Sequence, residues 1–236
     1  MRVCFAGVVL CILRSAIAQP TPEVEQLLHS VSPSVALVLT GSNRGVFSAA
    51  GSALIVRSNG ILFTALPLIR NVGGVQVRLQ NGETYDQVEM IGFDERRGVA
   101  ALRIPATGLP TVAAQESAQQ GDRIWLVSHP GALPWSAVPG TLGSLRLAEE
   151  LPGAGVGYRV WQFSATAPPG STGGALVDAG GRCLGIVVAA GGVGNVNLAI
   201  PLDSVMGLAS GTARISLNTG YRPAVPARPP ELPRGW

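Results

Sequence analysis

The residues best placed to do chemistry lie in one short loop, PPGSTGGAL, which runs from Pro168 to Leu176. Two hydroxyl side chains, Ser171 and Thr172, stand inside a frame of glycines, and the loop leads into an apolar segment that is typical of a β-strand. A hydroxyl that attacks a carbonyl needs an imidazole to accept its proton and a carboxylate to orient that imidazole. The loop therefore indicates nucleophilic chemistry only if such partners lie elsewhere in the chain.

Few residues could act as that base or as metal ligands. The chain has two histidines, His29 in an N-terminal segment and His129 in LVSHPGAL, and one cysteine beyond the first eleven residues, Cys183. This is too few for a zinc site, because such sites need clustered histidines and cysteines. We predict no metal and no cofactor. Cys183 stands in the apolar run RCLGIVVAA, which predicts a buried, inert thiol without a disulfide partner.

The N-terminus has the pattern of a secretory signal peptide. The segment MRVCFAGVVLCILRSAIAQP combines Arg2, a short apolar run and the small residues Ala16 and Ala18. These features predict that residues 1–18 are cleaved after Ala18. The apolar run is shorter than the roughly 20 residues that a membrane helix needs. We expect an exported protein, periplasmic or extracellular, without stable membrane insertion.

The charge pattern gives no sign of a nucleic-acid partner. Without residues 1–18 the chain loses Arg2 and Arg14, and its formal net charge falls from +3 to +1. The remaining arginines are scattered, whereas a nucleic-acid surface needs clustered cations. We expect no nucleic-acid partner.

The spacing of apolar residues predicts one short helix followed by many strands. PEVEQLLHSVSPS has apolar residues at helical spacing and stops at Pro33. From Val35 onward, short β-rich runs alternate with turn residues, and Asn59-Gly60 and Asn81-Gly82 predict two hairpins. This pattern favours an all-β fold and leaves the choice between a barrel and a sandwich open.

The C-terminal segment, residues 221–236, reads YRPAVPARPPELPRGW and is rich in proline. Such composition predicts an extended tail beyond a domain of residues 19–220. A polyproline ligand for an aromatic groove of a partner is the alternative.

Read in order, the segments resemble the protease domain of the Deg-type (high-temperature-requirement) subgroup of trypsin-like serine proteases. VSPSVALVL is similar to its first strand, GDRIWLVSHPG and VPGTLGSLR to the opening of its second barrel, and PPGSTGGALVDAGGRCLGIVVAA to its nucleophile loop and following hairpin. The resemblance extends from about Val24 to Val205. It implies a double six-stranded β-barrel of trypsin-like type, with barrels at roughly residues 35–110 and 111–215 and the site in the cleft between them.

The three positions that carry catalysis in the family are all changed here. The histidine segment of the form T-x-x-H corresponds to TALP, which places Pro67 at the base, and the segment DVALLK corresponds to GVAALR, which places Gly98 at the carboxylate. Thr172 stands at the serine. Proline cannot accept a proton, and the nearby Asp94 and Glu95 are expected to be solvated turn residues.

These changes predict a catalytically inactive homologue. Losing one triad member typically costs about 10⁴ to 10⁶ in turnover. The backbone N–H groups of Gly170 and Thr172 could still form an oxyanion-hole-like site, which would bind a protein or peptide ligand without cleaving it. The alternative for this loop is that its glycines serve only the turn that the fold requires. The alternatives are an endopeptidase with a rearranged catalytic set led by Thr172, with His129 as the first candidate base, and a scaffold that acts through its proline-rich tail.

Overall fold

The computed structural model describes residues 22–42, 46–115, 117–130, 134–151, 155–189 and 196–218. The predicted signal peptide and the predicted proline-rich tail both lie outside the described residues. Among the described residues, no helix has the length and apolar character needed to cross a membrane.

The predicted N-terminal helix is confirmed as α1, Pro22–Val31. Glu23 and Glu25 stand in its first turn, where carboxylates interact favourably with the helix dipole. Leu27 and Val31 are buried one turn apart, and they face the turn at Gly181. The helix ends in a 3₁₀ turn, η1 (Ser32–Ser34), that contains the proline, because a proline cannot continue the helical hydrogen bonding.

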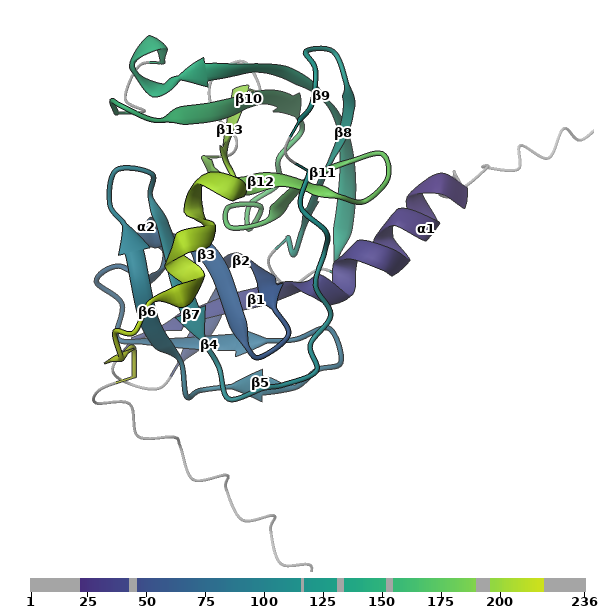
Figure 1. Ribbon diagram of the computed structural model, residues 1–236. Coiled ribbons are helices and arrows are strands. Elements are labelled where there is room, and N and C mark those ends of the chain that lie inside the picture. Colours follow the sequence, from purple (N-terminus) through teal and green to yellow (C-terminus); the bar gives the residue numbers. More distant parts are fainter. Residues whose placement is uncertain are drawn as a thin grey trace, which may run out of the picture.

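The first seven strands, together with β14 from the end of the described chain, form a curled sheet of eight antiparallel strands in the order β14-β6-β7-β3-β2-β1-β4-β5 (Figure 1). Both predicted Asn-Gly hairpins are present, one between β2 and β3 and one between β4 and β5. Gly60 and Gly82 have φ of 86° and 90° there, a conformation that glycine adopts without strain. The strands are β1 (Val35–Gly41), β2 (Phe47–Arg57), β3 (Ile61–Ala65), β4 (Gly74–Arg78), β5 (Thr84–Tyr85), β6 (Glu89–Asp94), β7 (Val99–Arg103) and β14 (Ile215–Ser216).

The second half is a closed six-stranded barrel in the order β10-β13-β12-β11-β8-β9. Figure 1 shows it above the first sheet. Closure removes free sheet edges. Its strands are β8 (Arg123–Ser128), β9 (Ser136–Leu147), β10 (Arg159–Ala165), β11 (Ala175–Asp178), β12 (Cys183–Ala189) and β13 (Val196–Pro201). The all-β, trypsin-like architecture expected from the sequence is therefore confirmed, with a curled half-barrel preceding a closed barrel.

Short helical segments connect and cover the two halves. α2 (Leu66–Ile69) directly follows β3. η2 (Ala148–Glu150) follows β9, and η4 (Asp203–Ser210) follows β13. η4 packs against β6 and β7 as well as β13, so it bridges the sheet and the barrel.

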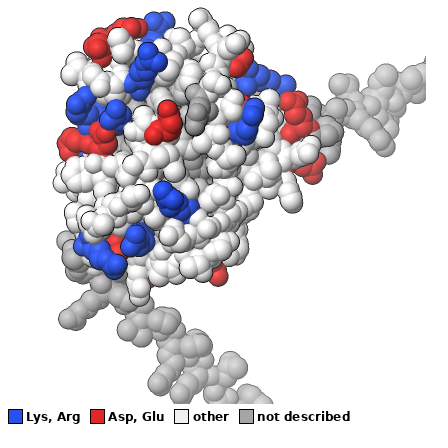
Figure 2. Space-filling model, viewed as in Figure 1, with Lys and Arg blue, Asp and Glu red and all other residues white. Residues whose placement is uncertain are grey.

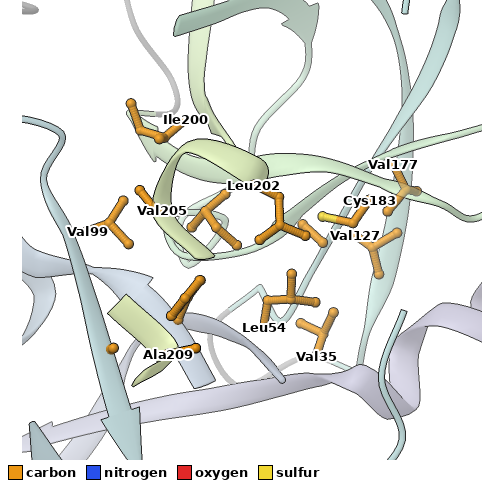
Figure 3. Packing of buried hydrophobic residues seen from close by; sticks show 14 of the residues in the cluster. Val35, Leu54, Val99, Val127, Val177, Cys183, Ile200, Leu202, Val205 and Ala209 are labelled. Atoms are coloured by element: carbon orange, nitrogen blue, oxygen red, sulfur yellow. The ribbon is translucent and has the colours of Figure 1, made fainter. Parts of the chain in front are cut away.

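One apolar cluster joins the two halves (Figure 3). Val35, Leu54 and Val99 come from the first sheet, and they pack in the same cluster as Val127 and Ile200 from the barrel. Two further clusters fill the interiors of the sheet and of the barrel. The shared cluster fixes the two halves against each other and so positions the loops that lie between them.

Arginine and acidic side chains are interspersed on the face seen in Figure 2, and broad uncharged areas separate them. Several charged side chains of the described residues form pairs, such as Arg123 with Glu23 at 3.3 Å and Arg146 with Glu150 at 3.4 Å. This face carries no large area of a single sign.

Candidate functional site

The loop that carries Thr172 is a tight glycine-framed turn between β10 and β11. Gly170 and Gly173 have φ of 93° and 84°, which side chains with a Cβ rarely adopt. Within the turn, the Ser171 N–H donates to the Pro168 carbonyl at 3.1 Å, and the Gly174 N–H donates to the Ser171 carbonyl at 3.0 Å. Glycine at these positions is therefore required by the backbone path.

β2 of the first sheet holds this loop in place. The Ser52 N–H donates to the Thr172 carbonyl at 2.8 Å, and the Ser52 hydroxyl donates to the Gly170 carbonyl at 2.9 Å. A Cβ on Gly173 would lie 1.9 Å from the Ser52 carbonyl oxygen. The loop thus connects two strands of the barrel, and its hydrogen bonds with Ser52 anchor it to the first sheet.

Ser171 points into the protein and not toward solvent. It is fully buried, and its Oγ lies 3.3 Å from the Oγ of Ser128 on β8. Of the two hydroxyl residues in the loop, Ser171 is therefore the one that is closed off from solvent. Thr172 is half-buried.

The Pro67 segment lies next to the other two candidate positions. Pro67 is exposed in α2, and the N–H of the preceding Leu66 donates to the Gly98 carbonyl at 2.8 Å. On the other side, a Cβ on Gly51 would lie 2.4 Å from Leu68 Cδ1 and 2.7 Å from the Thr172 carbonyl oxygen. The fold therefore brings together the three segments that sequence reasoning selected.

Gly98 occupies a left-handed backbone position with φ of 67°. A Cβ built on it would meet no atom within 4 Å. The position is thus open, and an ordinary side chain there would be strained by the backbone.

The acids near Gly98 are engaged in ion pairs. Asp94 accepts hydrogen bonds from the backbone N–H and the guanidinium of Arg97, at 2.9 and 2.6 Å. Burial acts to raise the pKa of Asp94, but these hydrogen bonds outweigh it, and the pKa lies below its usual value. Glu95 is exposed and pairs with Arg70 at 2.7 Å. The expectation of solvated turn residues fits Glu95, whereas Asp94 is half-buried because Arg97 compensates its charge.

Comparison with known proteins identifies the family. The family model of the trypsin-like peptidase domain matches residues 51–186, which are more than half of the chain. The chain belongs to the trypsin-like peptidase domain family. The chloroplastic Protease Do-like 1 of Arabidopsis thaliana is 30% identical over 169 residues, which are 67% of this chain and 38% of that protein. Serine endoprotease DegS of Haemophilus influenzae is 31% identical over 163 residues, 65% of this chain and 47% of that protein.

Solved structures show the same fold. The HtrA-type protease AlgW with a decapeptide gives a TM-score of 0.70 at 22% identity, covering 79% of this chain and 66% of that one. The active form of the Rv3671c protease of M. tuberculosis gives 0.70 at 20% identity, covering 89% and 96%. The chain spans about two-fifths to one-half of the length of the two curated relatives above. It is thus a Deg-type trypsin-like domain.

His129 lies beside the loop of this trypsin-like domain, and not at the surface. The side chain is buried, with a T-shaped contact between its ring and that of Trp135 at 4.5 Å. Its backbone N–H donates to the Ser52 hydroxyl at 2.9 Å, the hydroxyl that also holds Gly170. His29, by contrast, is exposed on α1.

Sequence reasoning missed the buried hydroxyls that hold the loop of the trypsin-like domain. These are Ser52, Thr64 and Ser128, and Thr64 donates to the Ser52 carbonyl at 2.7 Å. The available signal was a single hydroxyl residue inside each of three otherwise apolar strand runs, SALIV, ILFTA and IWLVS. Buried polar groups need hydrogen-bond partners, so such residues point to a specific contact.

The remaining candidates in this trypsin-like domain are the side chains of Cys183 and Asp178 and the backbone N–H groups of Gly170 and Thr172. Cys183 is buried, and the described residues contain no group of three or more side chains that could hold a metal ion. Asp178 caps the turn between β11 and β12, where its carboxylate accepts from the N–H groups of Gly180 and Arg182, each at 2.9 Å. Among the described residues, no acceptor takes a hydrogen bond from the N–H of Gly170 or Thr172.

Proposed function

We propose that this Deg-type trypsin-like domain is exported and binds peptide segments of other proteins without cleaving them. One observation carries the proposal: the segments that contain Pro67, Gly98 and Thr172 lie next to one another in the fold. Neither Pro67 nor Gly98 has a group that can accept or orient a proton. The loss expected from removing even one triad member is about 10⁴ to 10⁶ in turnover.

Binding is supported by the backbone of the Thr172 loop. The N–H groups of Gly170 and Thr172 donate to no acceptor among the described residues, and anchoring by Ser52 holds the loop in a fixed position. Preorganised N–H donors bind a carbonyl or carboxylate oxygen whether or not a nucleophile stands beside them. The related AlgW was solved with a decapeptide and with a tripeptide, which supports a peptide as the ligand.

Export is supported by the sequence of residues 1–18 and by the relatives. One of them is a probable periplasmic serine endoprotease, DegP-like, of Halomonas elongata, 27% identical over 165 residues. Detection of a mature N-terminus at Gln19 in the periplasm or the culture medium would test the proposed cleavage.

The decisive experiment compares the mature chain with Thr172→Ala and Thr172→Ser. We expect no cleavage of fluorescent casein and no fluorophosphonate labelling in any of the three. We also expect saturable binding of unfolded casein by fluorescence anisotropy, because binding uses the loop backbone and not the Thr172 hydroxyl. Absence of casein binding would contradict the proposal.

A second candidate, an endopeptidase led by Thr172, is favoured by one observation. The backbone N–H of His129 donates to the Ser52 hydroxyl, which holds the Thr172 loop, so this histidine lies near the loop. This candidate predicts cleavage of casein that Thr172→Ala abolishes, and His129→Gln would then be the next variant to assay.

A further inference from the structure

A cavity of about 290 Å³ lies beside Gly98, between the first sheet and the barrel. The barrel supplies an apolar wall, and the loop between β6 and β7 supplies the opposite side with Gly98 in it. The apolar wall consists of Val160, Val188, Ala189, Leu198 and Ile200, and Tyr158 lies beside it. Pockets for drug-sized ligands begin at about 300 Å³, so this cavity has room for a single side chain.

The glycine at position 98 keeps this space open. Gly98 has φ of 67°. No atom lies within 4 Å of a Cβ built on it, so no neighbouring group fills this space. A side chain at this position would extend into open space beside the apolar wall.

Each charged side chain at the rim of the cavity already makes an ion pair or a hydrogen bond. Arg97 pairs with Asp94 at 2.6 Å, and Glu95 pairs with Arg70 at 2.7 Å. Arg96 donates to the carbonyls of Val156 and Gly157, at 3.1 and 2.8 Å. A charged ligand group would compete with these interactions at the rim, whereas an apolar group would remove apolar surface of the wall from water.

The cavity is connected to the Thr172 loop through β12. Val188 on its wall follows Val187, whose carbonyl accepts a hydrogen bond of 2.7 Å from the N–H of Gly173. The Gly98 carbonyl is bonded to α2, next to Pro67. A peptide bound by the N–H groups of Gly170 and Thr172 would therefore pass close to the mouth of the cavity.

We propose that the Gly98 cavity is a specificity subsite that takes one uncharged, apolar side chain, of leucine or valine type, from a bound peptide. Binding of a peptide side chain in this cavity rests on the proposed function, whereas the cavity itself is defined by Gly98 and the barrel wall. The missing side chain at position 98 is what makes the subsite.

The test is a substitution that places a side chain in the cavity and leaves the residues of its apolar wall unchanged. Gly98→Asn adds a side chain at the mouth, and asparagine tolerates a positive φ better than most residues. Gly108→Asn is the matched control, because Gly108 has φ of 71°, no atom within 4 Å of its Cβ position, and no place in the lining of the cavity. Both variants should therefore carry the same backbone strain.

Two probes separate the subsite from peptide binding in general. N-acetyl-leucine methylamide, followed by NMR of the methyl groups of Val160, Val188 and Ile200, reports on the cavity alone. Short fluorescein-labelled alanine-serine peptides, with one leucine moved through every position, report on peptide binding by anisotropy.

We expect saturable methyl shifts in the wild type and in Gly108→Asn, and affinity for the probe at least about tenfold weaker in Gly98→Asn. The peptides should show a preference of about tenfold or more for leucine at one position, lost only in Gly98→Asn. Methyl shifts that are absent from the wild type, or unchanged in Gly98→Asn, would overturn the subsite. Shifts by the small probe without binding of any peptide would support the subsite and contradict the proposed function.

Discussion

Cys183 shows how strongly the core controls the chemistry of a single residue. It is fully buried in the cluster between the sheet and the barrel, and its Sγ lies 3.5 Å from the Gly185 carbonyl. Burial disfavours the thiolate and raises the pKa of the thiol from 9.0 to about 12. The thiol therefore stays protonated in the native state at pH values where an unfolded chain has lost the proton.

This difference predicts a pH-dependent loss of stability. Below pH 9 both states keep the thiol proton, and between pH 9 and about 12 only the native state keeps it. The unfolded state then binds fewer protons, so the free energy of unfolding falls as the pH rises through this window. Between pH 8 and pH 10 the thiol should account for a loss of about 1 kcal/mol.

Urea unfolding of the wild type and of Cys183→Ala at both pH values measures this term. The variant lacks the thiol and keeps all other titratable groups, so its free energy of unfolding should fall by about 1 kcal/mol less than that of the wild type. An equal fall in the two proteins would show that the thiol does not carry the effect.

At the scale of the elements, Ser52 is the point where β2 holds the Thr172 loop. Its hydroxyl donates to the Gly170 carbonyl and accepts from the His129 N–H, each at 2.9 Å. Ser52→Ala would leave both of these groups without that partner. Such a loss costs about 1–3 kcal/mol, so the midpoint of urea unfolding should fall.

Ser48→Ala is the matched control for Ser52→Ala, because Ser48 is exposed on the same strand. Exposed substitutions usually stay within about 0.5 kcal/mol. We also expect faster amide hydrogen exchange at His129 in Ser52→Ala alone. Equal stability of the two variants would show that the hydroxyl does not anchor the loop.

The elements that the sequence predicted are those set by local signals. Asn59-Gly60 and Asn81-Gly82 mark hairpins because the turn geometry depends on adjacent residues. The pairing of Ile215 with Met90, which returns the end of the chain to the first sheet, has no local signal. The same holds for the bond from Ser52 to Gly170, across 118 positions, since only the folded chain brings these residues together.

The candidate site likewise has features that the sequence predicted and features that only the folded chain creates. The positions of Pro67, Gly98 and Thr172 were predicted from segment order, and the structure brings their segments together. The positive φ of Gly98 and the cavity beside it were not predictable, because they depend on how the barrel wall packs against the loop between β6 and β7.

At the scale of the whole molecule, the sheet and the barrel share one core. Leu54 of β2 is fully buried in the same cluster as Val127 of β8 and Val177 of β11 (Figure 3). A core of this kind couples the two halves, because neither can unfold without exposing apolar surface of the other. The domain should therefore unfold in one transition.

The distribution of tryptophan allows a direct test of this coupling. Trp125 on β8 and Trp161 on β10 belong to the barrel, and no strand of the first sheet contains a tryptophan, so the fluorescence of these two residues reports on the barrel. Leu54→Ala removes a buried side chain from the first sheet and should cost about 2–5 kcal/mol. We expect the fluorescence transition in urea to shift by the full amount and to coincide with the circular dichroism transition.

Leu142→Ala is the companion variant, because Leu142 is fully buried in the cluster inside the barrel. If the halves unfold together, both substitutions shift the same transition, and neither changes its single-step form. If instead Leu54→Ala left the fluorescence midpoint unchanged while Leu142→Ala lowered it, the barrel would be stable on its own. The cleft between the halves would then be a flexible junction, and a preformed binding site at the Thr172 loop would lose its physical basis.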